Sequence, residues 1–269
     1  MRFRWLMALP FACARALMAQ SSGAPAAPTA VTLEFEVFAD LYGTRLVAAF
    51  DSIPAAKYDF RPTPVEQSVG YIAQHLEEAN YTLCGRFGGV QHPRTAKDEI
   101  PDTVKARWPK DTLVARLRAS VGFCDRALDR VTPASMASVT GSLLAYETDQ
   151  AEHYSQIAVY MRLLGLVPPS ALKRVFPPVV AVDHATLAAY AGTYALAKGL
   201  GLVVTLRDST LWIRSTNAGN AVRLWPSSST EFFIRELDAD VSFRRGGDGR
   251  VSGLTFREYG HDHPAERIP

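Results

Sequence analysis

The feature that most limits how this chain can fold is a change in its apolar pattern near Ala171. Before this point, apolar residues recur every three or four positions, which is the spacing of helices with one buried face. After it, β-branched and aromatic residues form short runs separated by turns, which is typical of strands. The pattern predicts an α+β two-domain fold, with a helical domain over 32–169 and a β-domain over 184–269.

The helical domain is expected to be a four-helix bundle. Gly88 and Gly89 end the second helical segment, and Gly165 followed by Pro168 ends the fourth. The expected helices cover 33–50, 66–87, 111–130 and 138–164. Because 88–110 is a long polar connection, the bundle has one long crossover and is not a simple up-and-down array.

The β-domain is expected to be a small antiparallel sheet or partial barrel. A linker over 170–183 leads into a short helix at 184–191. Strands are expected at 202–207, 210–214, 221–225, 232–235, 241–244 and 251–258. Short strands at this spacing, joined by turns, favour antiparallel neighbours. The His261-Asp262-His263 segment is interpreted as a solvated tail, and metal binding by its two histidines is the alternative.

The N-terminus has the order of features found in a secretory signal peptide. Arg2 and Arg4 precede a short apolar run that ends in small residues, and a loose Ala/Pro/Ser-rich linker covers 20–31. Arg15 interrupts the run, which is too short to cross a membrane comfortably. We expect cleavage of 1–19 and a periplasmic or secreted protein without a stable membrane span. The alternative is a plain N-terminal extension.

Charge argues against nucleic acid as a partner. The formal net charge is +2, and removal of the three arginines in 1–19 turns it into −1. The chain has no basic block and no stripe of arginines and aromatic residues. The expected partner is a small-molecule substrate, and homodimer formation is left open. Cys84 and Cys124 either form a disulfide, as export permits, or remain two buried thiols.

Three side chains form a candidate metal site. Asp149 and His153 lie four residues apart, so a helix places both on one face. His75 lies in the second helical segment and meets them if the two helices pack. Imidazole and carboxylate ligands suit zinc, nickel, iron or manganese, and three protein ligands leave a position for water or substrate. A metal-free hydrogen-bond network is the alternative, since burying these groups without partners is costly.

Further motifs surround the three residues. They are Tyr58-Asp59-Phe60-Arg61-Pro62-Thr63-Pro64 with Ser68, His75 with Asn80 and Cys84, and Glu152-His153-Tyr154 with Gln156, Tyr160-Met161-Arg162, Gly165 and Pro168-Pro169. On these residues the helical domain resembles the DinB-like (YfiT-like) superfamily of metal-binding four-helix bundles. The resemblance implies one histidine ligand on the second helix and two, four apart, on the last.

The chain departs from that family pattern at one ligand. Asp149 stands where the family usually has a histidine, and Ser155 stands where glycine is common. A carboxylate at Asp149 can still bind a metal and shifts the preference towards harder ions. The resemblance implies a metal-dependent hydrolase or thiol transferase of unknown substrate. The alternative is a non-catalytic binding or stress-associated protein with a degenerate site.

Four further residues on the same helix are candidates for roles near the site. Glu152 is a candidate acid/base group, and its alternative is an exposed helix carboxylate. Gln156 and Tyr160 follow the same face of the helix and are candidates to line the pocket, with a core role favoured for Tyr160. Arg162 is expected to bond backbone or carboxylate groups near the helix end.

The β-domain carries a second resemblance. Its motifs are Leu187, Tyr190-Ala191-Gly192-Thr193-Tyr194, Leu211, Leu224, Glu231-Phe232-Phe233, Val241-Ser242-Phe243, Gly249-Arg250-Val251 and Leu254. On these residues it is similar to the accessory domain that follows β-lactamase-like catalytic domains. The resemblance covers this domain alone, so it predicts an accessory module and not lactamase activity.

Overall fold

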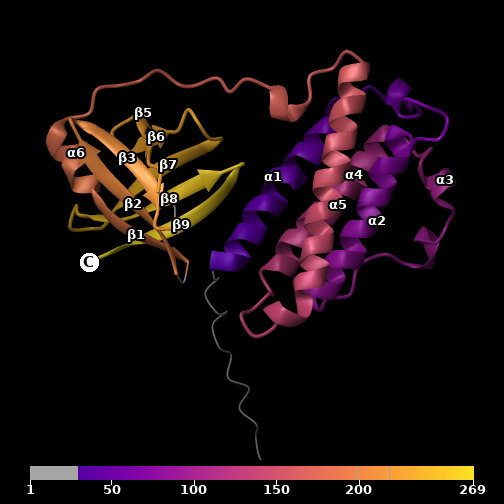
Figure 1. Cartoon of the computed structure of the whole chain (residues 1–269), viewed down its shortest axis with the longest axis horizontal. Coiled ribbons are helices and arrows are strands. Elements are labelled where there is room, and N and C mark those ends of the chain that lie inside the picture. Colours follow the sequence, from indigo (N-terminus) through magenta and orange to yellow (C-terminus); the bar gives the residue numbers. More distant parts are fainter. Residues whose placement is uncertain (1–29, 198, 218) are drawn as a thin grey trace, which may run out of the picture.

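The computed structural model describes residues 30–197, 199–217 and 219–269. Figure 1 shows a helical domain and a β-domain side by side, joined by an extended linker. The α+β two-domain architecture expected from the sequence is confirmed. The proposed signal peptide lies outside the described residues. No helix within the described ranges is long and apolar enough to cross a membrane.

Four long helices form the bundle: α1 (Ala30–Ser52), α2 (Val69–Gly88), α4 (Lys110–Leu128) and α5 (Met136–Leu163). The crossover between α2 and α4 contains the short helix α3 (Asp102–Lys105). Helix α2 packs against α4 and α5, and α1 packs against the same two helices. Their buried faces form one apolar core that includes Phe50, Ile72, Leu117 and Ile157.

Local capping sets the ends of the two helices that carry the candidate ligands. Helix α2 begins later than expected because the Ser68 hydroxyl accepts a hydrogen bond from the Tyr71 amide. Gly89 ends α2 in the left-handed conformation, with φ 59°. Gly165, with φ 73°, follows α5, and the Leu166 amide closes the end by bonding the Met161 carbonyl. These caps set the start and end of α2 and the end of α5.

A disulfide joins α2 to α4. Cys84 and Cys124 are bonded, their Cα atoms are 5.1 Å apart, and both residues are fully buried. They lie in a second apolar cluster of the bundle, together with Phe87, Leu143 and Tyr146. Of the two alternatives left open by the sequence, the structure therefore has the bridge.

The β-domain is a nine-stranded antiparallel sheet that nearly closes into a barrel. Its strands are β1 (Gly192–Ala197), β2 (Leu200–Arg207), β3 (Thr210–Ser215), β4 (Val222–Arg223), β5 (Trp225–Pro226), β6 (Glu231–Phe233), β7 (Ala239–Arg245), β8 (Val251–Glu258) and β9 (His261–Ile268). The strand order is β4-β3-β2-β1-β9-β8-β7-β6-β5. Since only Leu224 separates β4 from β5, the two edges of the sheet must lie next to each other. Helix α6 (His184–Tyr190) covers the side away from the bundle (Figure 1).

Three expectations for the β-domain were wrong. The segment at 261–263 is not a solvated tail, because it begins β9, which pairs with both β1 and β8. Strand β1 was missed, and the single strand expected at 221–225 is two strands on opposite edges of the sheet. The signal for β9 is weak because most of its outward positions are charged or proline and only Ala265 is fully buried.

The β-domain docks on α1 through the turn between β8 and β9. Tyr259 and Gly260 form this turn with positive φ angles of 50° and 92°. His261 Nε2 lies 3.1 Å from Asp40 Oδ1 on α1, and the Arg45 guanidinium lies 5.8 Å from the centre of the Tyr259 ring. Helix α1 therefore faces both the bundle core and the β-domain.

Candidate metal centre

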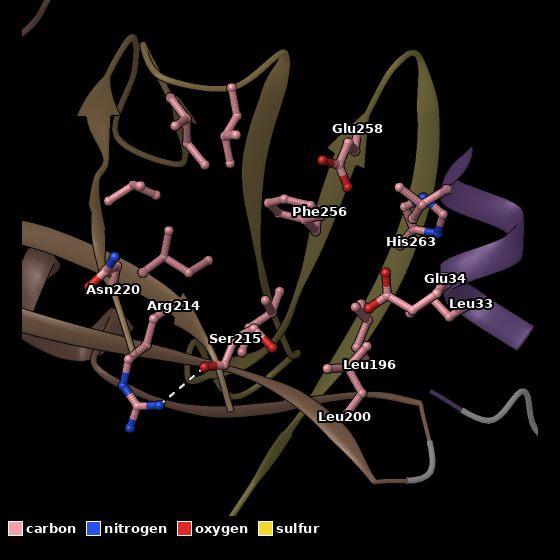
Figure 2. Close-up of a pocket in the computed structure, with 16 residues that line it drawn as sticks. Leu33, Glu34, Leu196, Leu200, Arg214, Ser215, Asn220, Phe256, Glu258 and His263 are labelled. Atoms are coloured by element: carbon pink, nitrogen blue, oxygen red, sulfur yellow. Dashed lines mark hydrogen bonds between the residues drawn. The ribbon is translucent and has the colours of Figure 1, made fainter. Parts of the chain in front are cut away.

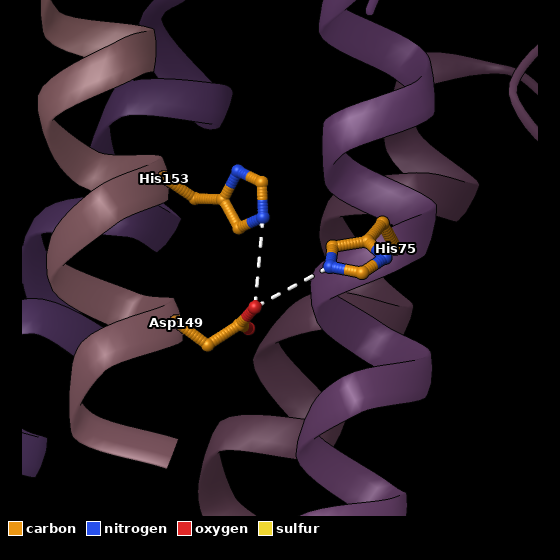
Figure 3. A group of neighbouring side chains, drawn as sticks. All are labelled: His75, Asp149 and His153. Atoms are coloured by element: carbon orange, nitrogen blue, oxygen red, sulfur yellow. Dashed lines mark hydrogen bonds and ion pairs between the residues drawn. The ribbon is translucent and has the colours of Figure 1, made fainter. Parts of the chain in front are cut away.

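The structure brings His75, Asp149 and His153 together, as the sequence predicted. His75 projects from α2, and Asp149 and His153 project from successive turns of α5 (Figure 3). Asp149 Oδ1 lies 3.4 Å from His75 Nε2 and 3.6 Å from His153 Nε2. One ligand atom from each residue lies within 4.8 Å of the other two. Among the described residues, this is the group of three or more histidine, cysteine or acidic side chains whose ligand atoms lie this close together.

These separations suit a metal ion. In a tetrahedral site with bonds of about 2.1 Å, neighbouring ligand atoms are roughly 3.4 Å apart. The two measured nitrogen-to-oxygen distances, 3.4 and 3.6 Å, lie close to that value. Three ligands would fill three corners and leave the fourth for water or substrate. The oxygen of Asp149 is therefore already at ligand spacing from both imidazoles.

A hydrogen-bond chain orients His153. Gln156 Nε2 donates to the Tyr160 hydroxyl at 3.1 Å, so the Gln156 carbonyl oxygen faces His153 Nδ1 at 2.9 Å. With this amide orientation, His153 Nδ1 carries the proton and donates it. His153 Nε2 is left with a lone pair directed towards Asp149. The Tyr160 hydroxyl completes the chain by donating to the Gln67 carbonyl at 3.1 Å.

The lone pair of His153 faces a carboxylate oxygen, and that arrangement is unfavourable unless a positive charge lies between them. A metal ion or a proton meets the requirement. The second carboxylate oxygen, Asp149 Oδ2, is buried and has no hydrogen-bond partner. The hydrogen bond that His75 donates to Asp149 raises the pKa of His75, against the opposing effect of burial. Each observation fits a cation held between the three side chains.

A buried amide chain fixes the register of the helices beside the site. Gln150, which follows Asp149 in the chain, donates to Asn80 Oδ1 at 2.7 Å. Asn80 Nδ2 donates to the Ser120 hydroxyl at 2.9 Å, so the chain links α5, α2 and α4. All three side chains are fully buried. Because a buried amide without partners is costly, this chain opposes any sliding of α5 against α2.

The other residues predicted to lie near the site differ in burial and in hydrogen bonding. Glu152 is exposed and lines an apolar groove of about 700 Å³ between α1 and α5, so its acid/base role at the triad is not supported. Tyr160 is buried in the core, as favoured, and its hydroxyl also belongs to the chain that orients His153. Arg162 bonds the Ala158 carbonyl near the end of α5, as expected. The role of Gln156 in orienting His153 was not predicted, although its three-residue spacing from His153 is a usable signal.

A polar cavity begins one helical turn from the triad. Tyr71 precedes His75 by four residues on the same face of α2 and lines a cavity of about 350 Å³. Glu66 and Gln67 also line it, and Gln67 accepts the hydrogen bond from Tyr160. The hydrogen-bond chain from His153 thus ends at a wall of this cavity.

The two histidines of β9 do not form a second metal site. Along β9, Asp262 points to the opposite face from its neighbours and pairs with Arg257. His261 contacts Asp40 of α1, whereas His263 lines a cavity between the barrel and α1. The metal-binding alternative for this segment therefore has no support in the geometry.

One motif of β-lactamase-like enzymes was overlooked in the sequence. Ser170-Ala171-Leu172-Lys173 has the Ser-x-x-Lys spacing of their nucleophile and its lysine. Ser170 lies in a short 3-10 turn (Pro169–Ala171), and both Ser170 and Lys173 are exposed in the interdomain linker. This setting lacks the buried, oriented partner that an activated serine needs. The expectation of an accessory β-domain without lactamase chemistry is unchanged.

Comparison with known proteins agrees with the two domains. A family model described as the DinB superfamily matches residues 41–157, which include all three candidate ligands. A second model, described as a domain of unknown function (DUF3471), matches residues 177–266. These matches confirm the resemblance of the helical domain and place a separate family unit on the β-domain.

Two individual proteins are similar over shorter stretches. Penicillin-binding protein 4* of Bacillus subtilis (strain 168) is 34% identical over 79 residues, which is 29% of this chain and 17% of that protein. This match loosely fits the resemblance to an accessory domain of β-lactamase-like proteins. The crystal structure of SurE with D-Leu is 22% identical, with a TM-score of 0.30, and the match covers 45% of this chain and 28% of that one. The chain thus spans less than a third of either protein.

Proposed function

We propose that this chain, whose helical part is a DinB-superfamily domain, binds one divalent metal ion through His75, Asp149 and His153 and acts as a metal-dependent hydrolase. The observation that carries the proposal is the convergence of three ligand atoms within 4.8 Å, with His153 Nε2 held as a lone-pair donor by Gln156. A bound ion would supply Lewis-acid activation of water or of a carbonyl group.

The chain's own residues would position the ion and the substrate. Gln156 and Tyr160 hold the imidazole of His153 in one orientation, and the chain from Gln150 to Asn80 holds the turn of α5 that carries Asp149. The cavity lined by Tyr71 offers room for a small polar substrate one helical turn from His75. The carboxylate ligand favours manganese, iron or zinc over softer ions.

Hydrolysis is favoured over thiol transfer by the Cys84–Cys124 disulfide. Disulfides persist in oxidising compartments, whereas low-molecular-weight thiol cofactors are kept reduced in the cytosol. The same disulfide supports our proposal that the protein is exported. N-terminal sequencing of the mature protein, isolated from its native host, tests this point. A mature chain that still begins at Met1 would contradict export by a cleaved signal.

Metal binding is tested by elemental analysis and by calorimetric titration of the purified chain with zinc, nickel, manganese and iron(II). We expect one ion per chain, and a loss of affinity of at least about 100-fold in His75→Ala and His153→Ala. Glu152→Ala is the matched control, because Glu152 neighbours His153 but lies on another face. Circular dichroism checks that the variants fold. Equal affinity in wild type and His153→Ala would refute the site.

The role of Asp149 has a separate test. Asp149→Ala should lower affinity, because it removes the oxygen ligand between the two imidazoles. Asp149→His restores three imidazoles and should shift the preference from manganese towards zinc and nickel. If both variants bind metals as the wild type does, Asp149 is not a ligand.

Catalysis is tested with p-nitrophenyl acetate and a small panel of esters and amides. Turnover should require the metal, and His153→Ala should abolish it while Glu152→Ala retains it. Stoichiometric metal binding without metal-dependent turnover of any probe would favour the alternative of a non-catalytic binding protein.

A further inference from the structure

The barrel of the β-domain has an open end that faces the helical domain. A cavity of about 310 Å³ lies there, lined by Leu202 and Ile213 from the barrel and by Leu33 and Val37 from α1. Figure 2 shows Leu196 and Leu200 on the barrel side of the cavity, with Leu33 and Glu34 of α1 at the other side. The cavity is separate from the metal triad, and neither domain alone encloses it.

Strand periodicity explains why the cavity exists. On β8, Leu254, Phe256 and Glu258 alternate with outward residues and therefore point into the barrel. Leu254 pairs with Ala265 and Phe256 pairs with His263 in the antiparallel register with β9. Leu254 and Ala265 are fully buried and close the barrel below the cavity. The next layer of inward side chains, with Phe256 and His263, does not fill the barrel. Towards α1 the wall of the remaining space changes from apolar to polar.

The polar groups on the side of the cavity next to α1 are acidic or uncharged. Glu258 of β8 and Glu34 of α1 line the cavity close to His263 (Figure 2). Burial raises the pKa of Glu258, and the negative charges of Glu34 and Asp238 raise it further. Burial lowers the pKa of His263, so its imidazole is neutral near pH 7. A positive charge here would relieve the repulsion between the carboxylates.

One nitrogen in the cavity lacks a partner. His263 Nε2 is buried and forms no hydrogen bond. Buried polar nitrogens are almost always bonded, so this atom calls for a donor or acceptor from outside the protein. The nearest cation at the cavity wall is Arg214, but its guanidinium bonds the Ser215 carbonyl at 3.1 Å and turns away from the acidic side (Figure 2).

We propose that this cavity binds a small amphiphilic amine, with its hydrocarbon tail against Leu202, Ile213 and Phe256 and its ammonium group between Glu34, Glu258 and His263. The volume lies at the lower end of the range for small-molecule sites, about 300–1,000 Å³. A fatty acid of the same length would place its carboxylate against two others. A neutral hydrocarbon would leave both carboxylates and the imidazole nitrogen without a partner.

The α1 wall makes the site dependent on domain docking. Glu34 and Val37 reach the cavity only while the turn between β8 and β9 contacts Asp40 and Arg45 of α1. Occupation of the cavity by an amine would therefore hold the two domains together by mass action. This inference does not depend on metal binding at the triad.

The test compares octylammonium, octanoate and octanol binding to the full-length chain by calorimetry and by methyl NMR. We expect octylammonium to bind at least tenfold more tightly than octanoate, and to shift the methyl signals of Leu202 and Ile213 but not of Leu144, which lies in the neighbouring groove on the far side of Glu34. The reverse order of affinity, or shifts confined to Leu144, would overturn the proposal.

Substitutions test where the ammonium group and the hydrocarbon tail of the amine bind. Glu258→Gln should weaken octylammonium binding about tenfold and leave octanol binding unchanged. Glu231→Gln is the matched control, because Glu231 is exposed and bonds Ser242 away from this cavity. Leu200→Trp places a large ring in the cavity and should abolish binding of both probes. If Leu200→Trp fails to fold, the methyl shifts of the wild type decide. Unchanged octylammonium affinity in Glu258→Gln would refute the charge assignment.

Discussion

The helical domain and the β-domain differ in what they bury. Among the described residues, every buried polar or charged side chain other than tyrosine lies in the helical domain, and the set is Thr32, Asp40, Ser68, Gln74, Glu77, Asn80, Lys105, Ser120, Gln150 and His153. The buried residues of the β-domain are apolar, aromatic or glycine. Its buried tyrosines, Tyr190 and Tyr194, direct their hydroxyls to backbone carbonyls.

The difference indicates that the interior of the helical domain is suited to chemistry, whereas the interior of the β-domain is suited to enclosing an apolar group. Buried polar groups cost free energy unless they are bonded, so a bundle that keeps ten of them has an interior organised around polar contacts. Several of these contacts adjoin or orient the metal triad. The β-domain is stabilised by apolar burial, and the inward-facing Glu258 and His263 lie where the barrel opens towards α1. The two domains should therefore respond differently to substitution.

The largest expected effect is on the helical domain. Replacement of both Cys84 and Cys124 by alanine removes a cross-link between residues 40 apart. A loop of this length corresponds to a loss of about 4 kcal/mol in the free energy of unfolding. Urea unfolding followed by hydrogen-exchange mass spectrometry reports each domain separately. Equal destabilisation of both domains would show that they unfold as one unit and would break the comparison.

The matching substitution in the β-domain is Leu254→Ala. Leu254 is fully buried in the barrel core, and its truncation should cost about 3 kcal/mol in that domain. Metal affinity at the triad should stay within twofold of the wild type, because none of the three ligands contacts the barrel core. The same hydrogen-exchange experiment and a metal titration check both points. A metal affinity that falls with barrel stability would contradict the separation of roles.

A smaller effect is expected from the hydrogen-bond chain in the bundle. Gln156→Ala frees the imidazole of His153 to rotate and should lower metal affinity about 10- to 100-fold, with little change in stability. Ser155→Ala is the control, because Ser155 is the exposed neighbour. Calorimetric metal titration measures the difference. Unchanged affinity in Gln156→Ala would show that packing alone orients the ligand.

Per pH unit, the smallest expected effect is a pH dependence at the domain contact. Burial, with the neighbouring charges of Asp125, Glu36 and Glu258, raises the pKa of Asp40 to about 8 from 3.8. Between these two values the folded chain holds a proton that the unfolded chain has lost. Stability therefore falls as pH rises from about 4 to about 8, by at most about 1.4 kcal/mol per pH unit. The imidazole of His261 contacts the Asp40 carboxyl group, so this pH dependence concerns the contact between the two domains.

Asp40→Asn provides the comparison for this slope, because an amide does not titrate. Urea unfolding at pH 5, 6, 7 and 8 should show a shallower decline in the variant than in the wild type. Some decline should remain, since burial also raises the pKa of Glu36, to about 7. Identical slopes in the two proteins would show that Asp40 keeps an ordinary pKa at the contact.

The two domains were also predictable to different degrees. All four long helices were expected from apolar periodicity, and their ends differ from the prediction by at most three residues. Helices are local, so spacing and caps such as Ser68 and Gly89 suffice. Strand β9 was missed because its partners, β1 and β8, supply the pairing that its own charged residues do not indicate.

The metal triad and the barrel cavity also differ in how far the sequence predicts them. The four-residue spacing of Asp149 and His153 predicts that both share one face of a helix, and the structure has this arrangement. That His75 meets them depends on the packing of α2 against α5. The cavity in the barrel was not predicted, because its walls come from strands far apart in the sequence and from α1.

The sequence alone determined the order of the two domains, the four helices and the stacking of two candidate ligands, because each of these depends on neighbours within a few helical turns. Only the tertiary structure decided that His75 completes the triad, that Cys84 and Cys124 are bonded, and that the barrel opens towards α1 beside Glu34. These features join residues distant in the chain, and their distances follow from how whole elements pack.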